Sequence, residues 1–443
     1  MSVKQIFNTS AELDYPTVLP TLDLDFANSK TLDPRITFTR ASGGSYTDVN
    51  GLIKYAGVNE ARFDHDPVTG ESLGFLVEEA RTNSFLYSEQ LDNAAWRKFD
   101  ITATANAGLA PDGTTTAELI TTASTTAQKY FDQFPQPVLQ TSSNYCVSFF
   151  VKLISGTGNA TSVSISSANG AISPVYASYA LRLDNFAEST EGNLPSVRGY
   201  TIFPNGWVRM YMVFNTSTQT NADIQFRFGT NDTVSSYHVW GYQFEQGSFP
   251  TSYIPTVAST RTRAADAASI TGKNFSSWFN PSVGTFFTDS TNDNLTSNIA
   301  RSAYDTANTV AFSLGSGAGR VYTPILGYLS NNTIICNLFS YNGGGTEFGP
   351  NLQNTLSNTA DVSRVCVYTD IVNNLYAIST AGQINVIGRP LDVSRTGQLA
   401  YTLAQSMVIG YNSNYYGNYI GRIKRITYYP KRLTNQQLQA LTT

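Results

Sequence analysis

The residues best suited to chemistry in this chain form a run rich in tyrosine and asparagine near its C-terminal end, YNSNYYGNY at 411–419. Aromatic rings stack on sugar rings and amide groups hydrogen-bond sugar hydroxyls, so such a loop is typical of a contact surface for a glycan or for a neighbouring subunit. Ordinary packing of a surface loop is a third interpretation. A second, weaker candidate is YNGGGTEF at 341–348. The candidate contact residues are Tyr411, Asn412, Asn414, Tyr415, Tyr416, Tyr419, Tyr341 and Asn342.

The triplet Asp64-His65-Asp66 invites a catalytic or metal-binding interpretation. Neighbours on a strand point to opposite faces of a sheet, so the two aspartates could share a face while His65 takes the other. Asp66 precedes a proline and is a common opener of turns. A solvated turn is therefore predicted, with a structural cation site as the alternative.

Glu78 and Glu79, in LVEEARTN, could suggest a carboxylate pair for glycoside cleavage. A glycosidase needs two carboxyl groups that face each other across a sugar, about 5 to 10 Å apart. Adjacent residues seldom satisfy that geometry. A role in stabilising the fold, with Arg81 as partner of one glutamate, is the preferred interpretation.

Other motifs for catalysis or cofactor binding are absent from the sequence. There is no G-x-S-x-G elbow, and His65 and His238 are the only histidines in the sequence that could act as the base of a catalytic triad. No phosphate-binding loop, dinucleotide fingerprint or zinc-type Cys/His spacing occurs. Cys146, Cys336 and Cys366 lie in strand-like runs and are expected to be small buried hydrophobes. The sequence therefore predicts a protein that is not an enzyme and carries no cofactor.

The composition is that of a β protein with a polar surface. The chain of 443 residues is long enough for two or three domains. Charged residues make up 14% and the formal net charge is −4, with no basic block, which argues against nucleic-acid binding. The apolar runs are too short to span a membrane, and the N-terminus lacks a secretory apolar region, so folding in the cytoplasm of the producing cell is expected.

The elements that must position these residues are mostly strands. Between about Thr82 and Tyr253, short strand-like runs alternate with turns rich in Gly, Asn and Ser, and no long helical period occurs. This spacing predicts an antiparallel, jelly-roll-like sandwich. One face of the run YCVSFFVKL is expected to carry Tyr145, Val147, Phe149, Val151 and Leu153.

The segment 240–266 is predicted to be a seam between two sandwiches. It begins as a strand in which Trp240, Tyr242 and Phe244 share one face, and two prolines then fix an extended run that cannot pair as a central strand. Trp207 and Trp240 lie in strong strands and are expected in the core.

From about residue 264 to 443 a second sandwich is predicted, and it ends in the only clear helix of the sequence. In RLTNQQLQALTT, Thr434 fits an N-cap with Gln437 three residues on, which is a capping box. Leu433 and Leu438 occupy the positions of a hydrophobic staple.

The N-terminal residues show weaker patterns. Residues 1–20 are interpreted as an arm that orders only against a partner. In LDLDF, Leu22, Leu24 and Phe26 share one face, and Asn-Gly at 50–51 is a hairpin signal.

Three stretches resemble virion proteins of tailed phages. DFANSKTLDPRITFTRAS and NEARFDHDPVTGESLGFLVEEARTN resemble the N-terminal region of head-spike and tail-fibre proteins. EQGSFPTSYIPT followed by TRAAD resembles the end of a carbohydrate-binding-module-like domain common in such proteins. GNYIGRIKRITYYPKRLTNQQLQALT resembles the last strand and helix of concanavalin-like (laminin-G-like) domains.

Pattern and resemblance together predict an all-β chain of tandem jelly-roll and concanavalin-like β-sandwiches, with a small β-rich N-terminal docking region and a short C-terminal helix. The expected domains are a virion-docking region at 1–80, a carbohydrate-binding-module-like jelly roll at 81–260 and a concanavalin-like sandwich at 261–443. Removing residues 1–80 is expected to abolish incorporation into virions and to leave the remainder soluble.

The resemblance implies a structural virion protein, a fibre, spike or tail-tip appendage of a tailed bacteriophage that is exposed on the particle and contacts host surface polysaccharide or lipopolysaccharide. The alternative is a capsid decoration or adaptor protein that binds no glycan, and a depolymerase would need a facing acid pair. Other virion proteins are expected to bind the N-terminal region, and homotrimers are common among such appendages. Neither nucleic-acid binding nor membrane insertion is expected. Jelly-roll carbohydrate modules often hold a structural calcium ion, which Glu245 or Asp25 could ligate, although neither shows a calcium-loop spacing.

Overall fold

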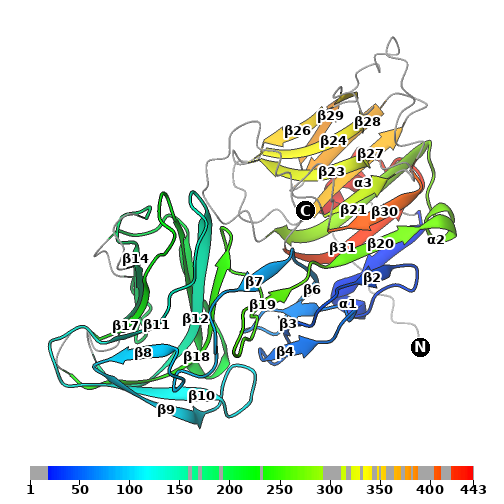
Figure 1. Cartoon of the computed structure of the whole chain (residues 1–443). Helices are drawn as coiled ribbons and strands as arrows, with labels where there is room; N and C mark the ends of the chain where they lie inside the picture. The colour runs from blue at the N-terminus through cyan, green and yellow to red at the C-terminus, as the bar shows by residue number, and fades with distance from the viewer. Residues whose placement is uncertain are drawn as a thin grey trace.

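A computed structural model of the chain describes residues 18–157, 162–167, 172–188, 193–229, 233–292, 311–315, 404–410 and 421–442, and it describes the backbone of further strands between residues 321 and 387. Figure 1 shows two β-lobes joined by a smaller set of strands. The paired strands that these residues form are antiparallel, and the helices are short, so the predicted all-β fold is confirmed.

The first sandwich consists of a six-stranded and a five-stranded sheet within the described part of the chain. In spatial order, the six-stranded sheet contains β15 (Arg198–Ile202), β16 (Val208–Asn215), β12 (Asn144–Ser155), β18 (Ser236–Gln246), β10 (Ala117–Thr122) and β9 (Ile101–Gly108). The five-stranded sheet contains β14 (Ser178–Arg182), β13 (Ser162–Ser167), β17 (Ile224–Phe228), β11 (Tyr130–Gln133) and β8 (Trp96–Phe99).

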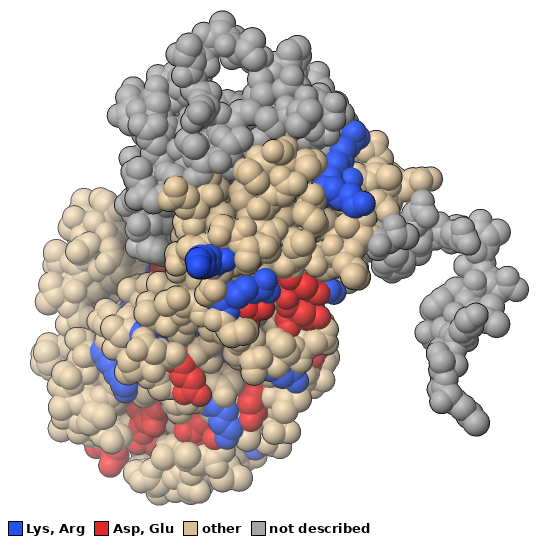
Figure 2. Space-filling view, turned by 90° about the vertical axis from the view of Figure 1, so that its right-hand side faces the viewer, with Lys and Arg blue, Asp and Glu red and all other residues tan. Residues whose placement is uncertain are grey.

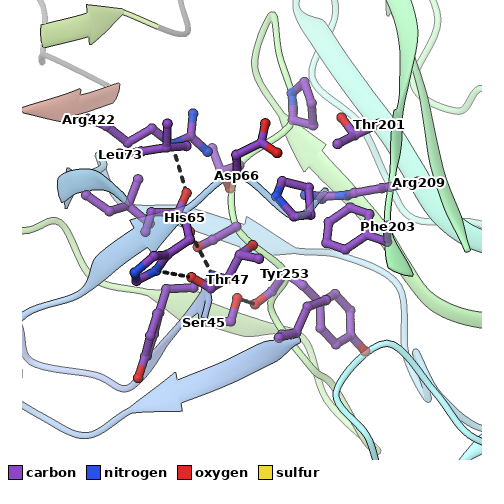
Figure 3. Close-up of a pocket in the computed structure, with 18 of the residues that line it drawn as sticks. Ser45, Thr47, His65, Asp66, Leu73, Thr201, Phe203, Arg209, Tyr253 and Arg422 are labelled. Carbon is purple, nitrogen blue, oxygen red and sulfur yellow. Dashed lines mark hydrogen bonds and ion pairs between the residues drawn. The ribbon is translucent and has the colours of Figure 1, made fainter. Parts of the chain in front are cut away.

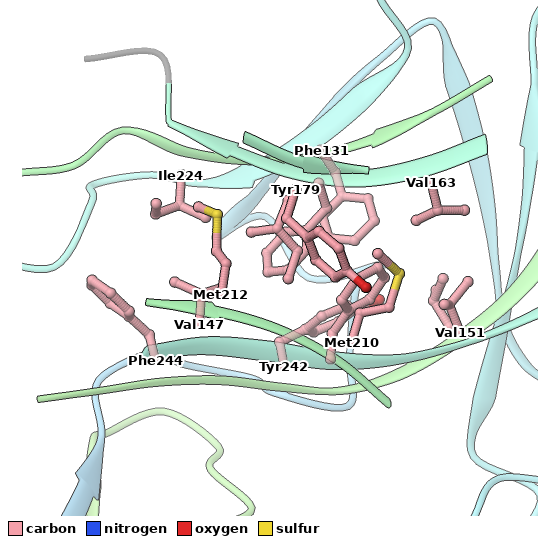
Figure 4. Packing of buried hydrophobic residues seen from close by; sticks show 14 of the residues in the cluster. Phe131, Val147, Val151, Val163, Tyr179, Met210, Met212, Ile224, Tyr242 and Phe244 are labelled. Atoms are coloured by element: carbon pink, nitrogen blue, oxygen red, sulfur yellow. The ribbon is translucent and has the colours of Figure 1, made fainter. Parts of the chain in front are cut away.

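The core of the first sandwich lies between these two sheets (Figure 4). The face of β12 predicted from alternation supplies Tyr145, Val147, Phe149 and Val151 to it, and Leu153 packs at its edge, as expected. Aromatic rings fill much of the space, because each buries a large apolar area.

The outer face of the six-stranded sheet is buried as well, against a second apolar cluster. This junction core contains Phe150 and Trp240 from the sheet together with Tyr253 and Ile53 from outside it. A strand buried on both faces reads as a continuous apolar run rather than as an alternation, which explains the stretch YCVSFFV.

The predicted common face of Trp240, Tyr242 and Phe244 is wrong. Tyr242 and Phe244 point into the sandwich core, whereas Trp240 lies in the junction core on the opposite face. The register against β12 shifts by one residue here, and Gly241 adopts a φ of +66°. This β-bulge turns Trp240 to the other side of the sheet. Trp207 and Trp240 are both buried, as expected.

The second sandwich is built from strands at both ends of the described chain. Its first sheet has the order β29 (Gln383–Ile387), β28 (Leu375–Thr380), β27 (Arg364–Asp370), β21 (Val283–Asn292), β31 (Gly421–Tyr429), β6 (Ser72–Val77) and β5 (Phe63–His65), and β1 (Leu22–Asp25) also pairs with β31. Its second sheet has the order β2 (Thr37–Thr39), β20 (Ala267–Thr271), β30 (Ser406–Ile409), β22 (Phe312–Gly315), β23 (Val321–Leu329), β24 (Thr333–Tyr341) and β25 (Glu347–Phe348), and β26 (Asn351–Thr355) pairs with β24.

The N-terminal strands thus complete the sheets of the second sandwich. Leu22, Leu24 and Phe26, predicted to share a face, are buried in its core beside Phe75 and Ile426. Residues before and after the first sandwich therefore form one folded unit. The docking role assigned to residues 1–80 stays a prediction.

Three short helices lie among the described residues, α1 (Phe26–Ser29), α2 (Gly272–Ser276) and α3 (Asn435–Thr442), besides the 3₁₀ turn η2 (Pro204–Gly206). The predicted capping box of α3 is confirmed: the Gln437 backbone N–H donates to Thr434 Oγ1 and the Thr434 N–H donates to Gln437 Oε1. Leu433 and Leu438, the predicted staple, are buried together on the outer side of the sheet that contains β21.

Between the sandwiches lie the hairpin of β3 (Gly44–Thr47) and β4 (Ile53–Ala56), formed around the predicted Asn-Gly turn, and the pair of β7 (Arg81–Asn83) and β19 (Arg261–Arg263). The two prolines of the predicted seam lie in an extended segment outside any strand. We call residues 40–66, 78–83 and 249–266 together the central joint.

Candidate functional site

The central joint is held by a buried network of arginines and carboxylates. Arg62 donates to Glu78 at 2.6 Å and to Asp266 at 2.5 Å, and Arg40 donates to the other oxygen of Asp266 at 3.0 Å. Arg263 lies 3.2 Å from Glu78. All five side chains are less than 5% exposed. The pairs of Asp266 with Arg62 and Arg40 join residues 204 and 226 positions apart in the sequence, and so they fix the two ends of the first sandwich against each other.

The charges in this network are stabilised by one another. Burial by itself would raise the pKa of Glu78, but the adjacent Arg263 and Arg62 outweigh burial and hold this pKa well below its ordinary value of 4.5. Burial likewise opposes the charge of Arg62, and the carboxylates of Asp266 and Glu78 reverse that effect and raise its pKa. Glu79 pairs with Arg81, as the sequence predicted for one of the two glutamates.

A pocket of about 340 Å³ opens where the central joint meets both sandwiches (Figure 3). One wall comes from the joint, with Thr47, His65 and Asp66, and the second comes from the outer face of β15 and β16. Arg422 of β31 contributes from the second sandwich. The lining combines aromatic rings, hydroxyls and charged groups, which is the mixture found in sites for small polar ligands.

The triplet Asp64-His65-Asp66 lines this pocket, and its structure differs in part from the predicted solvated turn. Asp66 does open a turn, because its Oδ1 accepts hydrogen bonds from the backbone N–H groups of the next residues. Asp64 and His65, however, are buried. Asp64 accepts from the Thr47 N–H at 2.7 Å and from Arg422 Nε at 2.8 Å, and His65 Nδ1 lies 3.1 Å from the Thr47 carbonyl oxygen. Tertiary contacts from β31, distant in sequence, cause this burial.

Arg209 of β16 points into the pocket from the side of the first sandwich (Figure 3). It lies on the outer face of the sheet directly opposite Thr201 of β15, and its guanidinium packs over the ring of Phe150 at 5.4 Å. Its Nη2 donates to Ser148 Oγ at 3.0 Å, while its Nε is buried without a hydrogen-bond partner. Burial lowers the pKa of Arg209 below its ordinary value.

The predicted contact residues are not among those whose side chains the structure describes. Tyr411, Asn412, Asn414, Tyr415, Tyr416 and Tyr419 lie outside the described residues, as does Asn342, and only the backbone of Tyr341, at the end of β24, is described. Their role stays a prediction. The sequence pointed to neither Arg209 nor Thr201, although the alternation in WVRMYMVF does place Arg209 on the face opposite Met210.

No group of three metal-ligating side chains occurs in the described parts of the chain. Glu245, one expected calcium ligand, is buried and accepts hydrogen bonds from the N–H and hydroxyl of Thr251 and from Gln243. Asp25, the other, caps α1. These surroundings do not fit a calcium site. Cys146 is buried, as expected, and the side chains of Cys336 and Cys366 lie outside the described residues.

The described residues on the face of the molecule seen in Figure 2 form no extended area of one charge sign. In Figure 2 most of the visible described surface is uncharged, and acidic and basic side chains are interspersed on it. Among the described residues no helix is long and apolar enough to cross a membrane.

No family model and no curated protein matches the chain. Among solved structures it is similar to the carbohydrate-binding module CBM40 of Ruminococcus gnavus IT-sialidase bound to α2,3-sialyllactose, with a TM-score of 0.29 and 13% identity over 38% of this chain and 88% of the other. It is also similar to the Trypanosoma rangeli sialidase in complex with sialic acid, with a TM-score of 0.26 and 10% identity over 74% of this chain and 60% of the other. Similarity at these TM-scores supports no statement about what this chain binds.

Proposed function

We propose that this chain is a structural, glycan-contacting appendage protein of a tailed-phage virion. In this proposal the two sandwiches are display modules, the central joint holds them in a fixed arrangement, and the pocket at the joint receives part of a host surface glycan. The phage origin rests on the resemblance of the N-terminal, seam and C-terminal sequences to virion proteins of tailed phages.

The observation that carries the glycan-binding part is the composition of the pocket at the joint. Phe203 and Phe249 offer aromatic surface, Thr47 and Thr201 offer hydroxyls, and Asp66 offers an acceptor, all around a volume of about 340 Å³. That volume lies at the lower end of the usual range for ligand pockets. Sugars need this mixture, because their ring faces are apolar and their edges are hydroxyl groups.

The direct test blocks the pocket from its rim. Thr201 is exposed on the edge strand β15, so the Thr201→Trp variant should fill the pocket without disturbing a core. The matched control is Thr102→Trp, an exposed threonine on β9, the opposite edge strand of the same sheet. Binding of each purified protein to an array of bacterial surface polysaccharides is the measurement.

Wild-type protein and Thr102→Trp should bind the same glycans, and Thr201→Trp should bind them at least about tenfold more weakly, with an unchanged melting temperature. Equal binding by both variants would exclude this pocket as the site. No binding by the wild-type protein would favour the alternative function, a capsid decoration or adaptor protein, and detection of the chain in purified virions tests the origin separately.

A further inference from the structure

We propose that the pocket at the central joint is selective for a sugar that carries a carboxylate, and that Arg209 is the group that receives this carboxylate. The proposal rests on the function proposed above, that the pocket binds a glycan, and it adds the chemical class of the sugar.

Two of the three carboxylates that line the pocket are paired with arginines, whereas Asp66 accepts hydrogen bonds only from the turn that it opens. Glu78 pairs with Arg62 and Arg263, and Asp64 pairs with Arg422. These groups contribute little net charge to a ligand, because each is compensated at hydrogen-bond distance.

Arg209 differs from the buried arginines of the joint, Arg40, Arg62 and Arg263, because it has no carboxylate partner. No carboxylate of the described residues lies within 4.0 Å of its guanidinium, and its one hydrogen bond goes to the neutral hydroxyl of Ser148. Among the groups of opposite charge Glu245 has the largest effect on the pKa of Arg209, but its oxygens accept hydrogen bonds from Thr251 and Gln243. A partly buried cation without an anion is costly, and a bound anion would relieve that cost.

A carboxylate suits this position better than a neutral group does. The guanidinium is a planar fork of donors that matches the two oxygens of a carboxylate, and such charge-assisted hydrogen bonds are about twice as strong as neutral ones. Arg209 Nη1 makes no hydrogen bond with the described residues and Nη2 makes one, so donors on the Nη1–Nη2 edge of the fork remain for a ligand.

The volume and the other lining residues of the pocket suit a sugar attached to that carboxylate. The volume of about 340 Å³ exceeds the needs of a small inorganic anion. Thr201 lies directly across the strand pair from Arg209, and Phe203 follows it two residues on. Asp66 receives its hydrogen bonds from the described residues on Oδ1, which leaves Oδ2 to accept from a sugar hydroxyl.

The test compares sugar acids with their neutral methyl esters. Glucuronate, galacturonate and N-acetylneuraminate, each paired with its methyl ester, are titrated into the full-length protein by calorimetry. We expect at least one acid to bind about tenfold or more tightly than its ester, which is the effect of one charge-assisted contact.

Arg209→Gln should remove that preference by weakening binding of the acid about tenfold and leaving binding of the ester within twofold. Arg209→Lys keeps the charge and loses the fork of donors. Its preference for the acid should lie between the preferences of the wild type and of Arg209→Gln. The matched control is Arg227→Gln: Arg227 of β17 is also partly buried and bonded to a neutral partner, Gln225, but it lies on the other sheet, away from the pocket. Unchanged melting temperatures of the variants exclude unfolding as the cause.

The outcomes separate this inference from the function on which it rests. Equal binding of acid and ester, or equal losses for both in Arg209→Gln, would overturn the preference for acids and leave glycan binding intact. Binding of none of the six compounds, when the array still shows binding that Thr201→Trp abolishes, would overturn the inference alone. No glycan binding in either experiment would overturn both.

Discussion

Arginine side chains at the centre of the molecule have the same chemistry but different surroundings. Arg62 contacts Glu78 and Asp266 and is fully buried, so its charge is compensated inside the protein. Arg209 is partly buried and has only the Ser148 hydroxyl as hydrogen-bond partner. The first arrangement holds the joint together, and the second is suited to a ligand.

Replacing Arg62 with Gln should destabilise the protein strongly, because Glu78 and Asp266 would remain buried with one cation fewer. Breaking a buried pair by removing one partner costs about 3–5 kcal/mol. Arg182→Gln is the control, since Arg182 pairs with Asp184 at the surface, with both side chains about one third exposed. That change should leave stability close to that of the wild type, because exposed ion pairs contribute little. Urea unfolding followed by tryptophan fluorescence measures both, and equal effects would contradict a structural role of the network.

Glu118 gives a prediction for the pH dependence of stability. It is buried, and burial raises its pKa to about 8, against the effect of hydrogen bonds from the Asp92 and Leu91 N–H groups. In the unfolded chain the carboxyl loses its proton near pH 4.5. Between pH 4.5 and 8 the folded protein therefore holds more protons, and the free energy of unfolding falls as the pH rises.

Glu118→Gln has no such proton to lose. Its stability relative to the wild type should therefore increase between pH 5 and 8, by about 1 kcal/mol or more at the upper end. Thermal and urea unfolding at several pH values check this. A difference between the two proteins that does not change with pH would show that Glu118 is ionised in the folded state.

At the scale of elements, the bulge in β18 decides how the first sandwich meets the joint. With Gly241 at a φ of +66°, Trp240 leaves the sandwich core and packs against Tyr253 in the junction core, with ring centroids 4.5 Å apart. A regular strand would have put Trp240 in the core with Tyr242 and left the junction without its largest ring.

Gly241→Ala should therefore destabilise the protein by about 1–3 kcal/mol, because an L-residue is strained at this φ and its Cβ would lie 3.0 Å from the ring of Phe150. Gly57→Ala is the control, since Gly57 has no positive φ and a Cβ there would meet only the Glu60 side chain at 3.4 Å. That change should cost no more than about 0.5 kcal/mol. Urea unfolding checks both variants, and a Gly241→Ala protein as stable as the wild type would show that the bulge is not required.

At the scale of the whole molecule, the chain first forms strands of the second sandwich, then forms the first sandwich, and then forms the remaining strands of the second. The strands β1, β2, β5 and β6 lie in sheets whose other strands come from residues after 260. The first sandwich is in effect an insertion between them, tied at its base by the ion pairs of Arg62 and Arg263.

This topology changes the expected outcome of deleting residues 1–80. The deletion removes β1, β2, β5 and β6 and exposes the core that Leu22 and Phe75 help to form, so the remainder should aggregate or be degraded rather than stay soluble. Deleting residues 1–17 leaves these strands intact and is the control. Solubility and limited proteolysis distinguish the two, and a stable, folded remainder after the longer deletion would contradict the shared sandwich.

The sequence by itself determined those features that depend on neighbours in the chain. The class of fold, the face of β12 that Tyr145 and Phe149 occupy, the Asn-Gly hairpin, and the capping box of Thr434 and Gln437 all follow from short-range periodicity and local hydrogen bonding.

Only the tertiary structure decided the features that depend on residues far apart in the sequence. The pairing of β1 and β6 with β31, the side of the sheet that Trp240 faces, the burial of Asp64 by Arg422, and the pocket beside Arg209 are of this kind. The physical reason is that a strand pattern fixes which residues share a face but not which strand becomes its neighbour or what covers its outer side. The joint and its pocket form where the segments before and after the inserted first sandwich pack against each other.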